Sequence, residues 1–147
     1  MAWDAGFSDL IDRSQIFPMY NKGDPEKAAK AYEHLLENVE FDLIMLGMGD
    51  DGHTASLFPK THALKTKGQK IAANFLPEKD VWRITMTFEE INRGRHINLY
   101  VMGASKASMI KKIFTDPYEP NRLPSQKIGT STHKALWILD QEAASLL

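Results

Sequence analysis

Apolar and polar residues are grouped along the chain in a way that predicts helices and strands in turn. Residues 24–39 predict a helix, because Asp24 suits the N-cap and Pro25 the first helical position. Residues 41–46 follow as a short apolar run. From Leu43 to Leu46 this run shows no alternation toward water, so we expect a strand that is buried on both faces.

Further elements continue this order to the end of the chain. Strands are expected at 70–75, 83–87, 96–102 and 135–139, helices or single helical turns at 4–12, 54–58, 88–94, 105–114 and 141–147, an extended piece at 16–20, and loops at 60–69 and 116–124. Strands that alternate with helices predict an α/β fold with three layers and a mainly parallel, modified Rossmann-like sheet. We expect residues 1–147 to form a single domain, because no linker or repeat interrupts the pattern.

Composition excludes several classes of function. The net charge of −1 gives no global field that would favour nucleic acid or an anionic membrane, and no apolar run approaches the roughly 20 residues needed to cross a bilayer. The chain has no cysteine, which excludes disulfides, cysteine nucleophiles and thiolate metal sites. The first residues show no secretory signal pattern. We therefore expect a cytoplasmic protein that binds neither nucleic acid nor membrane.

The loop after the apolar run at 41–46 carries the most informative polar residues. Gly49 allows backbone conformations closed to larger residues, and Asp50, Asp51 and His53 follow it. In open α/β sheets, ligands bind at the carboxyl ends of the strands. Histidine can take a proton from water near neutral pH, and a carboxylate two residues away can orient its ring. We therefore predict that His53 and Asp51 are catalytic.

A purely structural interpretation of this loop stays open. Asp50 or Asp51 could cap the turn at 54–58, with His53 an ordinary surface residue. A metal site is less favoured, because no second histidine lies at a ligand spacing such as i+4. We expect no metal here.

Two cations are candidates for binding an anion. Lys106 closes the segment 103–106, where a predicted strand ends and a helix begins, and the amides at a helix start favour an anion. We expect this segment at the same edge of the sheet as His53. Arg83 begins the segment RITMT, and its planar guanidinium can grip a phosphate with two parallel hydrogen bonds. The alternatives are a lysine on a solvated first turn and an arginine on the solvent side of a strand.

These motifs together resemble the 6-phosphogluconolactonase family, within the wider glucosamine-6-phosphate deaminase-like superfamily. The segments that carry the resemblance are DPEKAAKAYEHLL (24–36), DLIMLGMGDDGHTASLFP (42–59), WRITMTFEEIN (82–92), GASKASMI (103–110), LPSQKI (123–128) and ALWILDQEAASLL (135–147). The second of these is close to the family's signature of an apolar strand, G-x-G-x-D-G-H and A-S-L-F-P. The resemblance covers essentially the whole chain.

The resemblance implies hydrolysis of 6-phospho-D-glucono-1,5-lactone to 6-phosphogluconate, without a metal or organic cofactor. His53 matches the family's proposed general base, and Asp51 matches the acidic residue of the same loop. Arg83 and Lys106 match positions associated with the substrate phosphate. Within the glycine loop at 47–52, we expect the backbone at Gly49 and Gly52 to contact the substrate and stabilise the oxyanion.

The chain also departs from the family. Members are usually longer and begin with an apolar strand and a glycine-rich phosphate loop, and neither is found here. We therefore expect a fold that is incomplete at its N-terminus, and as partners a missing N-terminal segment or a second copy in a homodimer. Two other functions stay open: an enzyme like glucosamine-6-phosphate deaminase/isomerase, and a non-catalytic fragment that needs an N-terminal partner. The deaminase is less favoured because A-S-L-F-P follows the histidine, where deaminases carry an acidic residue.

Overall fold

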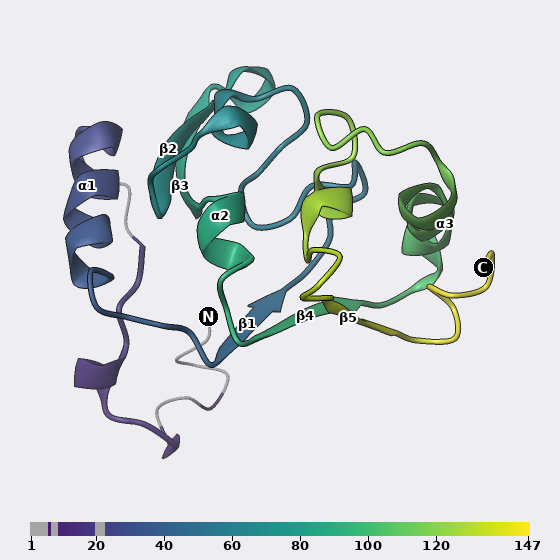
Figure 1. Ribbon diagram of the computed structural model, residues 1–147, viewed down its shortest axis with the longest axis horizontal. Coiled ribbons are helices and arrows are strands. Elements are labelled where there is room, and N and C mark those ends of the chain that lie inside the picture. Colours follow the sequence, from purple (N-terminus) through teal and green to yellow (C-terminus); the bar gives the residue numbers. More distant parts are fainter. Residues whose placement is uncertain (1–5, 7–8, 20–22) are drawn as a thin grey trace.

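The computed structural model of the chain describes residues 6, 9–19 and 23–147, and a parallel sheet of three strands runs along one side of it (Figure 1). The strands are β1 (Leu43–Leu46), β4 (His96–Val101) and β5 (Leu136–Leu139), in the order β1-β4-β5. Their carboxyl ends therefore meet at one edge of the sheet. The prediction of an α/β fold with a mainly parallel sheet is confirmed.

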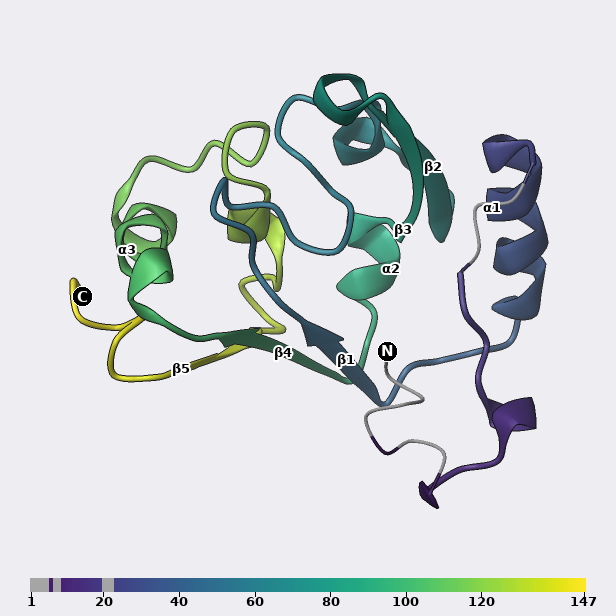
Figure 2. The same cartoon turned by 180° about the vertical axis from the view of Figure 1, so that it is seen from behind.

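The two middle strands of the sequence form a separate antiparallel hairpin. β2 (Ile71–Leu76) pairs with β3 (Val81–Met86) along its whole length, and the turn between them is the 3-10 helix η4 (Pro77–Lys79). Both strands were predicted, but they pair with each other and not with the parallel sheet. The hairpin stands between the sheet and helix α1 (Pro25–Leu35), which lies against it (Figures 1 and 2).

Helix α1 begins where the sequence predicts and ends early. The Asp24 carboxylate accepts hydrogen bonds from the backbone N–H groups of Glu26 (2.9 Å) and Lys27 (3.1 Å), which fixes the first turn. The helix stops at Leu35, whose side chain is 54% exposed, while Ala29 and Leu36 are buried against the hairpin. The expectation that residues up to 39 continue the helix was wrong.

Two helices cover one face of the parallel sheet. In both views α2 (Phe88–Ile91) and α3 (Ala107–Thr115) lie on the same side of the strands, and the 3-10 helix η5 (Ala104–Lys106) leads directly into α3 (Figures 1 and 2). The hydrophobic core lies between these helices and the sheet. Its buried side chains are Ile44, Met48, Leu57, Ala63, Leu64, Ala72, Phe88, Ile91, Ile97, Leu99, Val101, Ile110, Ile113, Leu123 and Ile128.

The opposite face of the sheet is open to solvent. Leu43 and Met45 of β1 are 46% and 64% exposed, and Leu136 of β5 is 57% exposed. The prediction that β1 is buried on both faces was therefore wrong. Parallel sheets normally carry helices on both faces. The elements in the described part of the chain supply the strands and the layer of α2 and α3, and no helix there forms the third layer.

Several local predictions differ from the structure. Residues 54–58 do not form a helical turn, because Thr54 and Leu57 make an isolated antiparallel bridge. The expected loop at 60–69 contains the 3-10 helix η3 (His62–Lys65), which buries Ala63 and Leu64.

The chain ends also differ. Residues 141–147 form turns, because the Asp140 carboxylate accepts a hydrogen bond from the N–H of Ala143 and holds a tight reversal. At the other end, the expected extended piece follows the 3-10 helix η2 (Arg13–Gln15), and Ile16 at its start has extended backbone angles (φ −106°, ψ 120°). Of the helix expected at 4–12, residues 4, 5, 7 and 8 lie outside the described residues, and residues 9–12 are not α-helical; Tyr20, the end of the extended piece, also lies outside the described residues.

Asn74 ties the hairpin to the segment that follows the glycine loop, so its loss should destabilise the fold. Its side-chain amide donates to the carbonyl of Ser56 (2.8 Å) and to Thr61 Oγ1 (3.0 Å), and it is completely buried. We expect Asn74→Ala to lower the free energy of unfolding by about 1–3 kcal/mol, because buried polar groups lose their partner. Urea denaturation measures this.

The matched control is Asn98→Ala. Asn98 lies half-buried on β4, and its one hydrogen bond among the described side chains is to the Tyr100 hydroxyl, at 3.3 Å. A loss of stability as large for Asn98→Ala as for Asn74→Ala would contradict the special role of the Asn74 contacts.

Candidate functional site

The loop that leaves β1 is a tight turn closed by its own backbone. The N–H of Gly49 donates to the carbonyl of His53 (2.9 Å), and the N–H of Gly52 donates to the carbonyl of Gly49 (3.0 Å). Gly52 has a φ of +78°, a conformation that residues with a Cβ rarely adopt. Both glycine N–H groups are thus used inside the loop. The expectation that they stabilise an oxyanion is therefore not supported for these two amides.

Asp51 and His53 form a short hydrogen-bonded pair at this turn. Asp51 Oδ1 lies 2.5 Å from His53 Nδ1 and also accepts the backbone N–H of His53 at 3.1 Å. Partial burial raises the pKa of Asp51, but the hydrogen bonds from the ring and backbone of His53 outweigh it, so this pKa lies below its usual range. An ionised carboxylate only accepts hydrogen bonds, so Nδ1 carries the proton of the pair. In the neutral ring with this tautomer, Nε2 carries the lone pair.

The imidazole is pressed against the backbone of Gly49. A Cβ at this position would lie 2.1 Å from His53 Cε1 and 2.2 Å from Nδ1, far inside any real contact. The absence of a side chain at Gly49 is thus what admits the ring to this position. Gly49 therefore contributes to the site by leaving room for the imidazole of His53.

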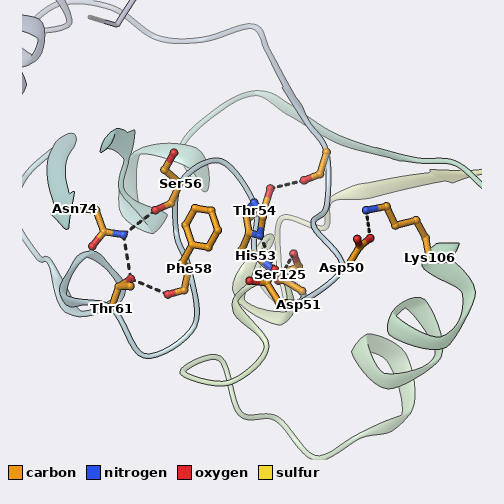
Figure 3. A network of polar contacts seen from close by, with 12 residues as sticks. Asp50, Asp51, His53, Thr54, Ser56, Phe58, Thr61, Asn74, Lys106 and Ser125 are labelled. Carbon is orange, nitrogen blue, oxygen red and sulfur yellow. Dashed lines mark hydrogen bonds and ion pairs between the residues drawn. The ribbon is translucent and has the colours of Figure 1, made fainter. Parts of the chain in front are cut away.

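Phe58 holds the His53 ring, a contact that the sequence reasoning missed. The two rings stack with centroids 3.8 Å apart and planes 19° from parallel, and the His53 side chain is 24% exposed (Figure 3). The imidazole is therefore fixed at Nδ1 by Asp51 and by Phe58 through ring stacking. Among the described residues, no hydrogen-bond partner lies at Nε2. The A-S-L-F-P block after the histidine was the signal that could have pointed to Phe58.

Other segments anchor the loop from outside. Ser125, completely buried in the 3-10 helix η6 (Pro124–Lys127), donates its Oγ–H (2.8 Å) and its N–H (3.0 Å) to the carbonyl of Gly52. Thr54 Oγ1 donates to the carbonyl of Gly47 at 2.8 Å, and the N–H of Ser56 donates to Thr85 Oγ1 of β3 at 3.1 Å. These buried contacts make the turn part of the core and explain why its side chains have defined positions (Figure 3).

Lys106 reaches the same loop from the neighbouring strand. Figure 3 shows its side chain extending from the beginning of α3 to Asp50, with Nζ 2.5 Å from Oδ1. The prediction that Lys106 and His53 lie at the same edge of the sheet is confirmed by this contact. The expected anion-binding amide nearby is already taken, because the N–H of Gly103 donates to both carboxylate oxygens of Asp140, at 3.0 and 2.9 Å.

Arg83 lies apart from the parallel sheet, on the hairpin. It pairs in register with Asn74, which puts both side chains on the same hairpin face as Thr85. Arg83 is exposed, whereas Asn74 and Thr85 are buried against the segment that follows His53. The hairpin thus brings Arg83 toward the site from a different side than Lys106. Its role in binding phosphate stays a prediction.

A cavity of about 320 Å³ opens beside Asp51 and Phe58. Its walls also include Lys60, Lys79, Leu76 and Glu78, and the ammonium of Lys79 lies 4.9 Å from the centre of the Phe58 ring. Neither Arg83 nor Lys106 is among its lining residues. His53 is not among them either, so the cavity reaches the pair at Asp51, beside one aromatic ring and charged side chains of both signs.

No metal site accompanies these groups within the described ranges. Over residues 6, 9–19 and 23–147, no three His, Cys, Asp or Glu side chains are grouped so that they could hold a metal ion. In the same ranges, no helix is long and apolar enough to cross a membrane.

The chain is similar to proteins of known family over most of its length. A family model described as glucosamine-6-phosphate isomerases/6-phosphogluconolactonase matches residues 2–137. A 6-phosphogluconolactonase of Synechocystis is 40% identical over 148 residues, which is 93% of this chain and 60% of the relative. A 6-phosphogluconolactonase of Chlamydia trachomatis is 36% identical over 137 residues, which is 90% of this chain and 52% of the relative.

Solved structures agree with the sequence relatives. The crystal structure of a protein called devB superposes with a TM-score of 0.83 at 30% identity, over 95% of this chain and 62% of that one. A 6-phosphogluconolactonase from Shewanella baltica superposes with a TM-score of 0.74 at 26% identity, over 82% of this chain and 55% of that one. The chain thus spans little more than half the length of the curated relatives it matches.

The contact between Gly49 and His53 predicts a severe effect of a single methyl group. We expect Gly49→Ala to displace the imidazole, to break its hydrogen bond to Asp51 and to lower the free energy of unfolding by about 1–3 kcal/mol. The ring resonances of His53 in NMR spectra and urea denaturation report the two effects. Gly47→Ala is the matched control in the same loop, because a Cβ there meets only the Tyr100 carbonyl oxygen, at an ordinary 3.9 Å. Equal behaviour of the two variants would contradict the proposed contact.

The lowered pKa of Asp51 predicts a pH-dependent contribution to stability. A carboxyl group whose folded pKa lies below its unfolded value of 3.8 stabilises the fold above that pH, and this contribution is lost as the pH falls through the folded pKa. We expect Asp51→Asn to lower the free energy of unfolding by up to about 1 kcal/mol at pH 6, and by progressively less below pH 4. Thermal unfolding across this range measures the difference. In a His53→Ala background the difference should shrink, because only the backbone N–H of residue 53 still donates to Asp51; an unchanged difference would show that the imidazole is not its cause.

Proposed function

Because the chain belongs to the glucosamine-6-phosphate isomerase/6-phosphogluconolactonase family, we propose that it is a 6-phosphogluconolactonase. The proposed reaction hydrolyses 6-phospho-D-glucono-1,5-lactone to 6-phosphogluconate. Because this chain spans only about half of the relatives' length, their activity is proposed for it and does not follow from the similarity alone. The observation that carries the proposal is the Asp51–His53 pair, with Nδ1 fixed and Nε2 unpartnered among the described residues.

In the proposed mechanism His53 is the general base. Nε2 takes a proton from a water molecule, and the water oxygen attacks the lactone carbonyl carbon to form a tetrahedral oxyanion. The bond between that carbon and the ring oxygen then breaks, and the imidazolium returns the proton to the departing ring oxygen. The Asp51 carboxylate, 2.5 Å from Nδ1, stabilises the transient imidazolium and keeps the ring oriented.

The substrate phosphate is proposed to bind the two cations. Lys106 supplies a charge next to the glycine loop, and Arg83 supplies a planar fork from the hairpin. The N–H groups of Gly49 and Gly52 donate within the loop. These glycines are therefore proposed to contact the substrate through the shape of the loop surface and not through hydrogen bonds. No step in this mechanism requires a metal ion or an organic cofactor.

The proposal also covers the cellular location of the protein and the further polypeptide that would cover its sheet. We propose a cytoplasmic enzyme whose ligand is a sugar-phosphate lactone. The exposed face of β1 and β5 supports a need for further polypeptide, either an N-terminal segment or a second copy of the chain. A non-catalytic role for this chain alone would follow if that covering polypeptide were essential for activity.

The decisive experiment is a lactonase assay with His53→Ala. We expect kcat to fall by a factor of about 10²–10⁴, the usual contribution of a positioned acid–base group. The assay is run on this chain alone and mixed with the N-terminal part of a longer relative. His62→Ala serves as the control, because His62 is an exposed residue of η3 outside the site.

Two results would overturn the proposal. One is near-normal turnover by His53→Ala, and the other is the absence of lactone hydrolysis both with and without the added segment. Release of ammonia from glucosamine 6-phosphate, in place of lactone hydrolysis, would identify the deaminase alternative.

A further inference from the structure

The ion pair between Asp50 and Lys106 is asymmetric in its exposure to water. The Lys106 side chain is 22% exposed, whereas the Asp50 side chain is 80% exposed. The lysine is held mostly among protein atoms at the start of α3, and the aspartate contacts it from the solvent side (Figure 3). The carboxylate can therefore leave the ammonium and enter water without any rearrangement of the core.

We infer that Asp50 is a competitor for the phosphate site: it holds the Lys106 ammonium until the phosphate of the substrate displaces it. The inference rests on the proposed function and names a specificity-determining residue for it. Asp50 does not take part in the proton transfers assigned to His53 and Asp51.

The local donors favour such an exchange at Lys106. One backbone donor of the segment 103–106, the N–H of Gly103, already serves both oxygens of the Asp140 carboxylate. Lys106 is the cationic residue of this segment, and among the described residues its partner Asp50 makes a single ion pair, at the surface. A pair of this kind contributes little, whereas a phosphate dianion offers more negative charge and three acceptor oxygens.

The competition has a consequence for selectivity. A ligand must bring enough negative charge to replace a carboxylate on Lys106, so a phosphorylated sugar acid binds and its unphosphorylated counterpart gains nothing from this site. Removing the charge of Asp50 should therefore strengthen binding of the phosphorylated ligand only. If Asp50 instead served to position Lys106, its removal would weaken that binding.

The test measures binding of 6-phosphogluconate and of gluconate to the full chain by isothermal titration calorimetry. We expect Asp50→Asn to bind 6-phosphogluconate about three- to fivefold more tightly than the wild type and to leave gluconate binding unchanged. Asp116→Asn is the matched control for loss of one negative charge, because Asp116 is paired with Arg122 outside the site. It should bind both ligands as the wild type does.

Lys106→Met separates this inference from the proposed function. If Lys106→Met weakens binding of 6-phosphogluconate while Asp50→Asn leaves it unchanged or weakens it, the competition is refuted and the phosphate site stands. If Lys106→Met has no effect, or if neither the wild type nor Asp50→Asn binds 6-phosphogluconate, both the phosphate site and the competition are refuted.

Discussion

The parallel pairing of β1 with β4 is the constraint that creates the candidate site. Leu46 lies opposite Leu99, so the loops that leave the two strands start at the same edge of the sheet. Residues more than 50 positions apart in the chain thereby come into contact. The ion pair between Lys106 and Asp50 links the two loops. A one-residue shift of this register would turn either Ile44 or Ile97 out of the core, so their burial fixes the arrangement.

Two consecutive carboxylates serve different partners at this edge. The turn from Gly49 to His53 sends Asp51 back to the imidazole, while Asp50 points outward to Lys106 (Figure 3). The same turn buries the Gly52 carbonyl against Ser125. Since each aspartate already has a cationic or titratable partner, they do not act as a paired acidic site. One supports proton transfer in the proposed mechanism, and the other controls access to a cation.

The sequence predicted the elements with strong local signals. Asp24 and Pro25 predicted the start of α1. The apolar run before Gly47 predicted β1 and the loop after it. The sequence pattern also placed Lys106 and His53 at one edge of the sheet, because that followed from the alternation of strands and helices. Contacts that depend on tertiary packing could not be predicted in this way.

Phe58 and Asp140 illustrate this limit. The stacking of Phe58 on His53 depends on how the segment 54–61 is bound by Asn74 and Thr85 of the hairpin, far along the chain. Asp140 receives the Gly103 N–H only because β5 lies beside β4. The burial of β1 was misjudged for a related reason: an apolar strand is buried on both faces only when a layer covers each face, and the composition of the strand does not reveal which layers are there.

The geometry of the site and the covering of the sheet are physically separable. The contacts that hold the loop of the Asp51–His53 pair come from Ser125 of η6, from Asn74 of the hairpin and from Thr54 within the loop. Leu43, Met45 and Leu136 lie on the exposed face of the sheet and make no part of that network. A polypeptide that covered them would add apolar burial, and hence stability, without having to move His53. It would alter the proposed chemistry only by adding groups of its own, since the Asp51–His53 pair is already assembled by this chain.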